Sequence, residues 1–198
     1  MNYLGHAYLS FEHPEILVGN IISDFVKGKK KYDYPIGIQK GIALHREIDD
    51  FSDSHPATKQ AKEIFRPHYR LYASAFMDVV YDYFIANDTN IFNEESLYAF
   101  TQQTYSFLEE RKQWFPERFA AMFPYMKAHN WLYNYRHSWG IERSFGGLVR
   151  RATYLNESEV AFRLFQENID PLREYYNQFI GELKNFAKKR FIALLEEK

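Results

Sequence analysis

The sequence contains no cysteine, and this absence removes several kinds of chemistry. Disulfide bonds, zinc–thiolate sites, iron–sulfur clusters and thiol nucleophiles all depend on that residue. Any bound metal would therefore be held by His, Asp and Glu side chains. That ligand set suits Mn, Mg or Fe better than structural zinc.

An excess of charge of one sign and long apolar runs are also lacking. The formal net charge of −1 over 198 residues argues against a dedicated nucleic-acid binder, which usually carries a strong basic excess. No apolar run approaches the roughly 18 residues of a membrane span, and the first residues lack a signal-peptide pattern. We therefore expect one cytoplasmic domain over residues 1–198, with neither nucleic acid nor membrane as a partner.

Familiar catalytic motifs are missing as well. The sequence has no G-x-x-x-x-G-K-[ST], G-x-S-x-G or H-E-x-x-H, and the absence of E-x-x-H counts against a ferritin-like di-iron protein. It also shows neither an alternating strand pattern of useful length nor an internal repeat. Apolar residues recur instead at helical spacing, and aromatic residues, 19% of the chain, offer large buried areas. The sequence predicts an all-α fold, a single-domain helical bundle.

Local signals place the expected helices. We expect Gly28 to end one helix, Asn93 to cap another, and Asn156 with Glu159 to form a capping box. An N-cap at Asp53 or Ser54 is an alternative to a role for Asp53 at a metal site. The last segment is expected to break near Pro171. The predicted helices cover residues 2–10 (a helix or turn), 15–26, 35–54, 57–65, 73–86, 94–112, 116–128, 129–150 and the remainder of the chain.

The helix that ends near Pro56 has an unusual inner face. In helical projection Ile38 lies about 20° and Asp49 about 40° from His45, and both share its side with Ile42. An imidazole and a carboxylate inside an apolar stripe cost free energy unless another group satisfies them. The acidic residues at the end of this helix also oppose its macrodipole. A bound cation would answer both problems.

The segment 73–86, ASAFMDVVYDYFIA, repeats the problem on a second helix. It is apolar on almost every side, as a buried helix is, yet Asp78 and Asp82 share one face. Two buried carboxylates need a counter-charge, and residues 71–86 contain neither Lys nor Arg. Arginines from another helix would supply one answer. A divalent cation shared with His45 and Asp49 is the sharper hypothesis.

Together these segments resemble the acyl carrier protein phosphodiesterases, also called holo-acyl-carrier-protein hydrolases. The resemblance extends from the first residues to about residue 151, whereas the last third matches only in helical character. The motifs that carry it are Asn2-x-Leu4-x-His6, Gly19-Asn20 with Asp24-Phe25-Val26-x-Gly28, His45-Arg46-x-Ile48-Asp49-x3-Asp53-x2-Pro56, Asp78-Val79-x2-Asp82-x-Phe84, Trp131-Leu132-x2-Tyr135-Arg136 and the region Gly147 to Arg151.

The resemblance implies a rearranged HD-domain-like phosphohydrolase that uses Mn²⁺, with Mg²⁺ or Fe²⁺ as alternatives. Its reaction releases 4′-phosphopantetheine from the serine of holo-acyl carrier protein and leaves the apo form. His45 is followed by Arg46 rather than by the Asp of ordinary HD proteins, which leaves the metal count open. By motif match, the metal-ligand candidates are His6, Asp24, His45, Asp49 and Asp78. Asp53 and Asp82 are the catalytic candidates, with support of the metal ligands as the alternative role.

The basic loop Lys27 to Tyr34 has two interpretations. It is either a solvated loop or a docking surface for an acidic partner or a phosphate. Since acyl carrier proteins are acidic, the resemblance implies that the loop and Arg151 steer the carrier protein towards the site. The predicted docking residues are Lys27, Lys29, Lys30 and Arg151.

Two other functions compete with this one. The first is a metal-dependent phosphohydrolase that acts on a nucleotide or another small phosphate ester. The second is a helical interaction protein without catalytic activity, whose buried acids pair with Arg and Lys. The second predicts no thermal stabilisation by Mn²⁺, whereas a native state that binds a metal is stabilised by it.

Overall fold

The computed structural model describes residues 1–197, and within that range its regular elements are all helices, which confirms the all-α prediction. Four short 3-10 segments accompany the α-helices: η1 (Ser23–Phe25), η2 (Gly28–Asp33), η3 (Arg70–Tyr72) and η4 (Lys112–Trp114). The α-helices in this range are α1 (Tyr3–Tyr8), α2 (Pro14–Ile22), α3 (Ile36–Ser54), α4 (Pro56–Lys62), α5 (Arg66–Tyr69), α6 (Ala73–Asn87), α7 (Glu94–Glu109), α8 (Glu117–Ala128), α9 (Trp131–Asn134), α10 (Ser138–Arg151), α11 (Glu159–Glu167) and α12 (Ile169–Glu196).

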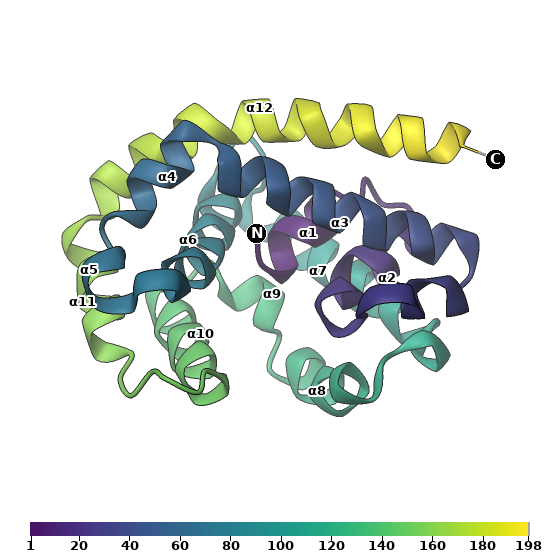
Figure 1. Ribbon diagram of the computed structural model, residues 1–198, viewed down its shortest axis with the longest axis horizontal. Helices are drawn as coiled ribbons and strands as arrows, with labels where there is room; N and C mark the ends of the chain where they lie inside the picture. The colour runs from purple at the N-terminus through teal and green to yellow at the C-terminus, as the bar shows by residue number, and fades with distance from the viewer. Residues whose placement is uncertain (198) are drawn as a thin grey trace.

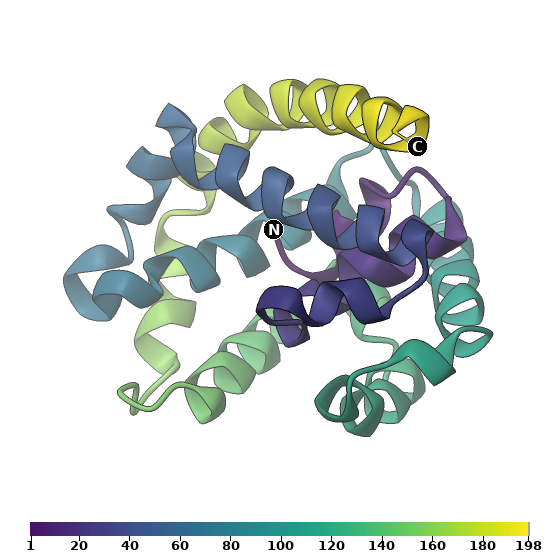
Figure 2. The same cartoon turned by 45° about the vertical axis from the view of Figure 1, so that its right-hand side comes forward.

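The long C-terminal helix α12 packs along α3 and α4 and forms one side of the molecule (Figures 1 and 2). Its aromatic side chains anchor it, and the rings of Phe51 and Phe186 stack with centroids 4.5 Å apart. The helices α8, α9 and α10 lie on the opposite side, with α1 and α6 between the two layers (Figure 1). No helix among the described residues is long and apolar enough to cross a lipid bilayer.

Helices α2 and α3 cross at two glycines, and this crossing sets the position of His45. A Cβ added to Gly19 would overlap the Ile38 carbonyl oxygen and lie 2.8 Å from the Gly41 Cα. A Cβ on Gly41 would overlap the Ile16 carbonyl oxygen in the same way. The two backbones therefore touch directly, which only glycine permits. This contact brings the His45 face of α3 against the end of α2.

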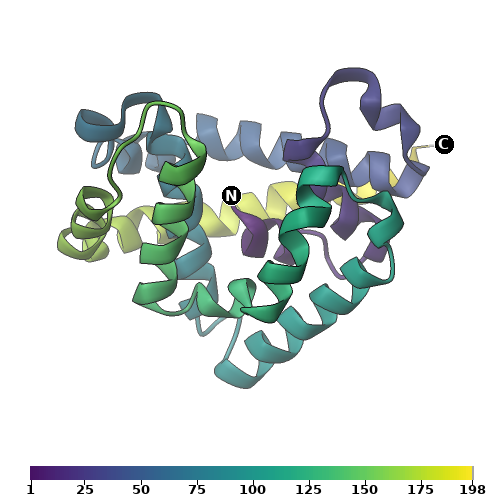
Figure 3. The same cartoon turned by 90° about the horizontal axis from the view of Figure 1, so that it is seen from below.

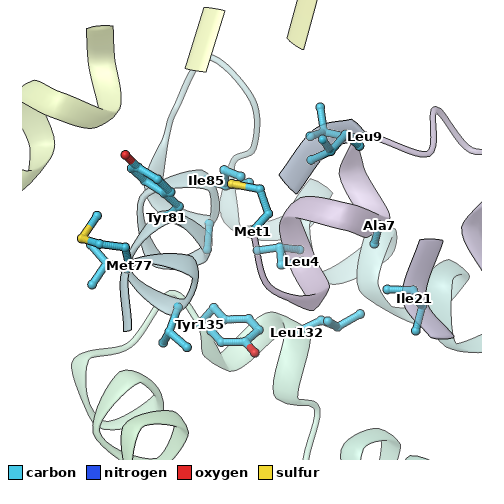
Figure 4. Close-up of a cluster of buried hydrophobic side chains, with 14 of the residues drawn as sticks. Met1, Leu4, Ala7, Leu9, Ile21, Met77, Tyr81, Ile85, Leu132 and Tyr135 are labelled. Atoms are coloured by element: carbon cyan, nitrogen blue, oxygen red, sulfur yellow. The ribbon is translucent and has the colours of Figure 1, made fainter. Parts of the chain in front are cut away.

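The first residues of the chain are part of the core. Met1 and Leu4 are buried beside Met77, Tyr81 and Ile85 of α6 (Figure 4). Burial of these side chains contributes about 1.5–3 kcal/mol each. The α1 segment is thus held in the centre of the fold, beside α3 and α6, although it is short.

The predicted helix over residues 129–150 is wrong, because the structure divides it in two. Asn130 adopts the left-handed conformation with φ 45°, which Asn tolerates better than most residues. A short helix follows, and α10 begins only at Ser138, after His137 in an extended conformation. A Cβ on Gly140 would overlap the Asn134 carbonyl oxygen, so the start of α10 lies against the end of α9.

The predicted helix ends were right in part. Asn93 caps α7 as expected, and it shares a capping box with Ser96. The capping box at Asn156 is wrong, since α11 begins at Glu159 with Ser158 before it. The break expected near Pro171 lies at Asn168 instead, and Pro171 belongs to the first turn of α12, where its missing N–H is harmless.

The N-cap predicted at Asp53 or Ser54 is wrong. Helix α3 continues to Ser54, and the ring of His55 caps α4 by accepting a hydrogen bond from the Ala57 N–H at 3.2 Å. Asp53 lies in the last turn of α3, and its carboxylate pairs with Lys62 of α4. Gly28 has the positive φ of +58° that favours glycine, but it begins η2 and does not end a helix as expected.

Candidate metal centre

Three side chains from two helices converge at the centre of the fold. His6 comes from α1, and His45 and Asp49 come from successive turns of α3. Their ligand atoms all lie within 4.8 Å of one another. The His6 Nε2 is 3.2 Å from one carboxylate oxygen of Asp49, and the His45 Nε2 is 3.0 Å from the other. One carboxylate is therefore shared by two buried imidazoles.

The two imidazoles have different proton affinities. Their rings stack with centroids 3.9 Å apart, so two positive charges would repel each other. Burial, together with the charge of His45, lowers the pKa of His6 to about 4. Burial also opposes charge on His45, but hydrogen bonds to Asp24 and Asp49 outweigh it and raise its pKa to about 9. His6 is thus neutral at pH 7, as a metal ligand must be, whereas His45 would have to release its proton when it binds a metal.

Asn20 holds this cluster in place, and the sequence argument missed its role. Its carbonyl oxygen lies 2.7 Å from the His45 Nδ1, and its side-chain amide donates to the His6 carbonyl oxygen at 3.0 Å and to Ser10. A hydrogen bond on Nδ1 turns Nε2 towards the centre of the cluster, as in metal sites. The available signal in the sequence was a single Asn within the apolar run LVGNII, and the structure shows this Asn to be fully buried.

Asp78 reaches the cluster through the α-ammonium group of Met1. The Met1 nitrogen lies 3.1 Å from Asp49 and 3.0 Å from Asp78. Burial opposes this charge, but Asp78 and Asp49 outweigh it and raise the Met1 pKa to about 11. Burial raises the pKa of Asp78 to about 6, although the ammonium pulls it down. The counter-charge for Asp78 is therefore this ammonium, which a search for Lys and Arg could not find.

Asp24 is the remaining acidic residue of the cluster, and it lies on the solvent-exposed side of His45. Its side chain is 74% exposed, and its Oδ1 lies 3.2 Å from the His45 Nε2. The hydrogen bond from His45 lowers the Asp24 pKa below its usual value. All five predicted metal ligands thus lie in one contiguous network.

The two predicted catalytic carboxylates lie outside the group of ligand atoms. Asp82 is fully buried, and both its oxygens accept backbone N–H groups at the start of the chain: Leu4 at 2.7 Å, Gly5 at 3.0 Å and Asn2 at 3.2 Å. Burial raises its pKa to about 7, against the pull of the Met1 ammonium and these donors. Asp53 is exposed and pairs with Lys62 at 2.6 Å.

The predicted docking residues lie around the openings of the site. Lys27 lines a cavity of about 450 Å³ together with Asp24, His45 and Asp49. Lys29 and Lys30 are exposed on η2 beside it. Arg151, at the end of α10, lines a second cavity of about 350 Å³ with Asp24 and Asp78. The acidic centre thus has a basic residue at each of two openings.

The residues present fit a divalent ion. Among residues 1–197 the buried His6 Nδ1 has no hydrogen-bond partner, and two imidazoles share one carboxylate with further carboxylates beside them. A nitrogen and oxygen donor set of this kind suits Mn²⁺, Fe²⁺ and related ions. The fold and the site therefore define an all-helical protein with the donor set that metal-dependent hydrolases use.

The comparison with known proteins agrees with this class. The family model for acyl carrier protein phosphodiesterase matches residues 1–183, and the chain belongs to that family of hydrolases. Proteins named acyl carrier protein phosphodiesterase from Enterobacter sp. (strain 638) and Photorhabdus laumondii are 30% and 29% identical to it over 191 residues, with 96% of this chain covered in both and 99% and 96% of theirs. No solved structure matches, so the HD-domain-like arrangement stays a prediction.

Proposed function

We propose that this protein hydrolyses the phosphodiester that joins 4′-phosphopantetheine to the serine of holo-acyl carrier protein, giving the apo-carrier. The observation that carries the proposal is the shared centre of His6, His45 and Asp49, found in a chain of the acyl carrier protein phosphodiesterase family. The names of the relatives indicate acyl carrier protein as the substrate. The centre supplies ligands for the ion that such chemistry needs.

The proposed cofactor is Mn²⁺, with Mg²⁺ and Fe²⁺ as alternatives. His6, His45 and Asp49 would hold the ion, and Asp24 and Asp78 would extend the ligand set. When bound, such an ion lowers the pKa of water and neutralises charge on the phosphate oxygens. Without that neutralisation the carboxylates around the centre would repel a phosphodiester.

The residues of the chain have separate proposed tasks. Arg151 shares a cavity with Asp24 and Asp78, where its guanidinium would hold a phosphate oxygen and keep phosphorus at the centre. Asp53, the exposed one of the two predicted catalytic carboxylates, is the proposed acceptor of the proton from water. The buried Asp82 would act indirectly, by fixing the N–H groups that position His6.

The carrier protein is the proposed partner at the opening lined by Lys27. Lys27, Lys29 and Lys30 are exposed on one short segment, and the cavity beside them ends at His45 and Asp49. An acidic carrier would be attracted to this segment, and its modified serine would then face the centre. The attraction is electrostatic, so salt should weaken it.

Incubation with holo-acyl carrier protein tests the proposal. We expect the intact mass of the carrier to fall by the phosphopantetheine group with Mn²⁺ and to stay unchanged with chelator. An unchanged carrier in both reactions would contradict the proposed substrate. Thermal stabilisation by Mn²⁺ in that case would shift the proposal to a smaller phosphate ester, and its absence would favour a helical interaction protein.

A further inference from the structure

A cavity of about 510 Å³ between α8, α9 and α10 has no role in the account so far. It lies on the side of the molecule opposite α12, and Figure 3 shows α8 and α10 on either side of the start of the chain. Its apolar wall includes Met122, Trp131, Tyr135 and Trp139. A pocket of this size and lining holds an elongated organic group rather than a lone ion.

The cavity adjoins a smaller one that reaches two of the candidate metal ligands. Asn2, Tyr3 and Arg151 line both this cavity and the smaller one that reaches Asp24 and Asp78. Arg151 therefore stands at the junction, where a phosphate would lie between the centre and the larger cavity. Asp24 also lines the cavity beside Lys27, so that cavity and the smaller one beside Arg151 meet at Asp24.

We propose that this cavity is the channel for the pantetheine arm of the substrate. The inference rests on the proposed function, because the arm is the group that the reaction would release. The carrier would dock at the Lys27 opening and the phosphate would lie at Arg151, while the arm extends along α10. The arm is uncharged, carries methyl groups and amides, and fits a channel with aromatic walls and scattered polar groups.

Two hydroxyl groups that line the channel can form further hydrogen bonds with a ligand. The Tyr3 hydroxyl, at the junction, donates to the Met122 sulfur at 3.9 Å, and a thioether is a weak acceptor. The Ser144 hydroxyl donates to the Gly140 carbonyl oxygen at 2.8 Å and retains its own lone pairs. An amide or hydroxyl of the arm would give both groups a better partner.

Two adjacent glycines in α10 explain how the helix leaves this space open. Gly146 and Gly147 lie inside the helix, where each glycine costs about 1 kcal/mol relative to alanine. A Cβ on Gly147 would meet only the Arg150 guanidinium, at 3.8 Å. The missing side chain at 147 thus serves no tight packing contact, and a larger residue there would project into the channel.

Gly147→Leu tests the channel, with Gly147→Ala as its matched control. Both substitutions favour the helix, but only leucine fills the channel. We expect Gly147→Leu to lower kcat/KM for holo-acyl carrier protein by about tenfold or more, a size that obstruction of a substrate pocket reaches. Hydrolysis of methyl para-nitrophenyl phosphate, which is too short to enter the channel, should match the control. Calorimetry should show 4′-phosphopantetheine binding to the wild type and to Gly147→Ala, with binding lost in Gly147→Leu.

The outcomes separate this inference from the proposed function. Equal activity of Gly147→Leu and Gly147→Ala on the carrier would overturn the channel, and so would parallel losses on both substrates. A wild-type protein without activity on the carrier would contradict the proposed function. In that case the calorimetry still decides the channel, since binding of 4′-phosphopantetheine that leucine abolishes supports it and unaltered or absent binding overturns it.

Discussion

Asp49 is the residue on which the centre depends most. It contacts His6, His45 and the Met1 ammonium at 3.0–3.2 Å. Burial alone would raise its pKa, but the ammonium and His6 outweigh burial and hold the pKa well below its usual value. Asp49 is therefore a carboxylate at any working pH, ready to balance a cation.

Asp49→Asn should remove binding of Mn²⁺. Wild-type protein at a Mn²⁺ concentration 100 times the dissociation constant should gain about 2.7 kcal/mol of stability, measured as a rise in Tm. The variant keeps the shape of the side chain and loses its charge, so its Tm should not respond to Mn²⁺. Asp50→Asn is the matched control, since Asp50 is the exposed neighbour on the same helix. Equal responses of the two variants would contradict the assigned ligands.

Asp82→Asn should lower the stability of the protein more than it lowers the rate of hydrolysis. The carboxylate accepts three backbone N–H groups, and an amide would turn its NH₂ towards at least one of them. The unpaired donor should cost about 1–3 kcal/mol in free energy of unfolding, measured by chemical denaturation. A variant of unchanged stability that has lost turnover would instead identify Asp82 as a catalytic carboxylate.

At the scale of elements, the crossing of α2 and α3 sets the geometry of the site. The two helices meet backbone to backbone at Gly19 and Gly41. The contact puts the Asn20 carbonyl within 2.7 Å of His45. A greater separation of the helices would break the hydrogen bond between the Asn20 carbonyl and His45, which orients the His45 ring. Packing and ligand geometry are therefore coupled.

Gly41→Ala should destabilise the protein by about 1–3 kcal/mol, because the new methyl group overlaps backbone atoms of α2. It should also reduce the Mn²⁺-induced rise in Tm. Gly181→Ala is the matched control: its Cβ meets nothing within 4 Å, so alanine in α12 should leave the protein as stable or more so. Equal stabilities of the two variants would contradict the close crossing.

The sequence predicted the positions of the helices better than their ends and the contacts between them. The periodicity of α3 correctly placed His45 and Asp49 on one face, because residues four apart share a side of a helix, although Asp49 is 38% exposed rather than buried. The Met1 ammonium beside Asp78 was missed, since the pairing joins groups 77 residues apart. The division at Asn130 was missed because its left-handed conformation leaves the apolar pattern intact. The His55 cap was missed because imidazole is an unusual N-cap.

At the scale of the whole molecule, the centre lies between two openings of different character. The opening beside Lys27 is bordered by an exposed basic segment. The other leads past Arg151 into an aromatic cavity. Such an arrangement suits a substrate that is a protein on one side of its phosphodiester and a slender organic chain on the other.

Charge reversal at the basic opening should weaken carrier binding without altering the chemistry. Replacing Lys29 and Lys30 by Glu should raise KM for holo-acyl carrier protein by about tenfold at low salt, with kcat little changed. The difference from wild type should shrink as salt is added. The same double change at Lys188 and Lys189, exposed on α12, is the control. A KM that responds equally to both pairs would rule out a specific docking surface.

The most direct test of the central claim is to run the reaction in water enriched in heavy oxygen and weigh both products. Hydrolysis at phosphorus by a water bound at the His6, His45 and Asp49 centre should put the label into 4′-phosphopantetheine. The carrier should return to its unlabelled serine form, and chelator or Asp49→Asn should abolish both changes. An unlabelled phosphopantetheine, a carrier lighter by one water, or full activity in Asp49→Asn would contradict hydrolysis at this centre.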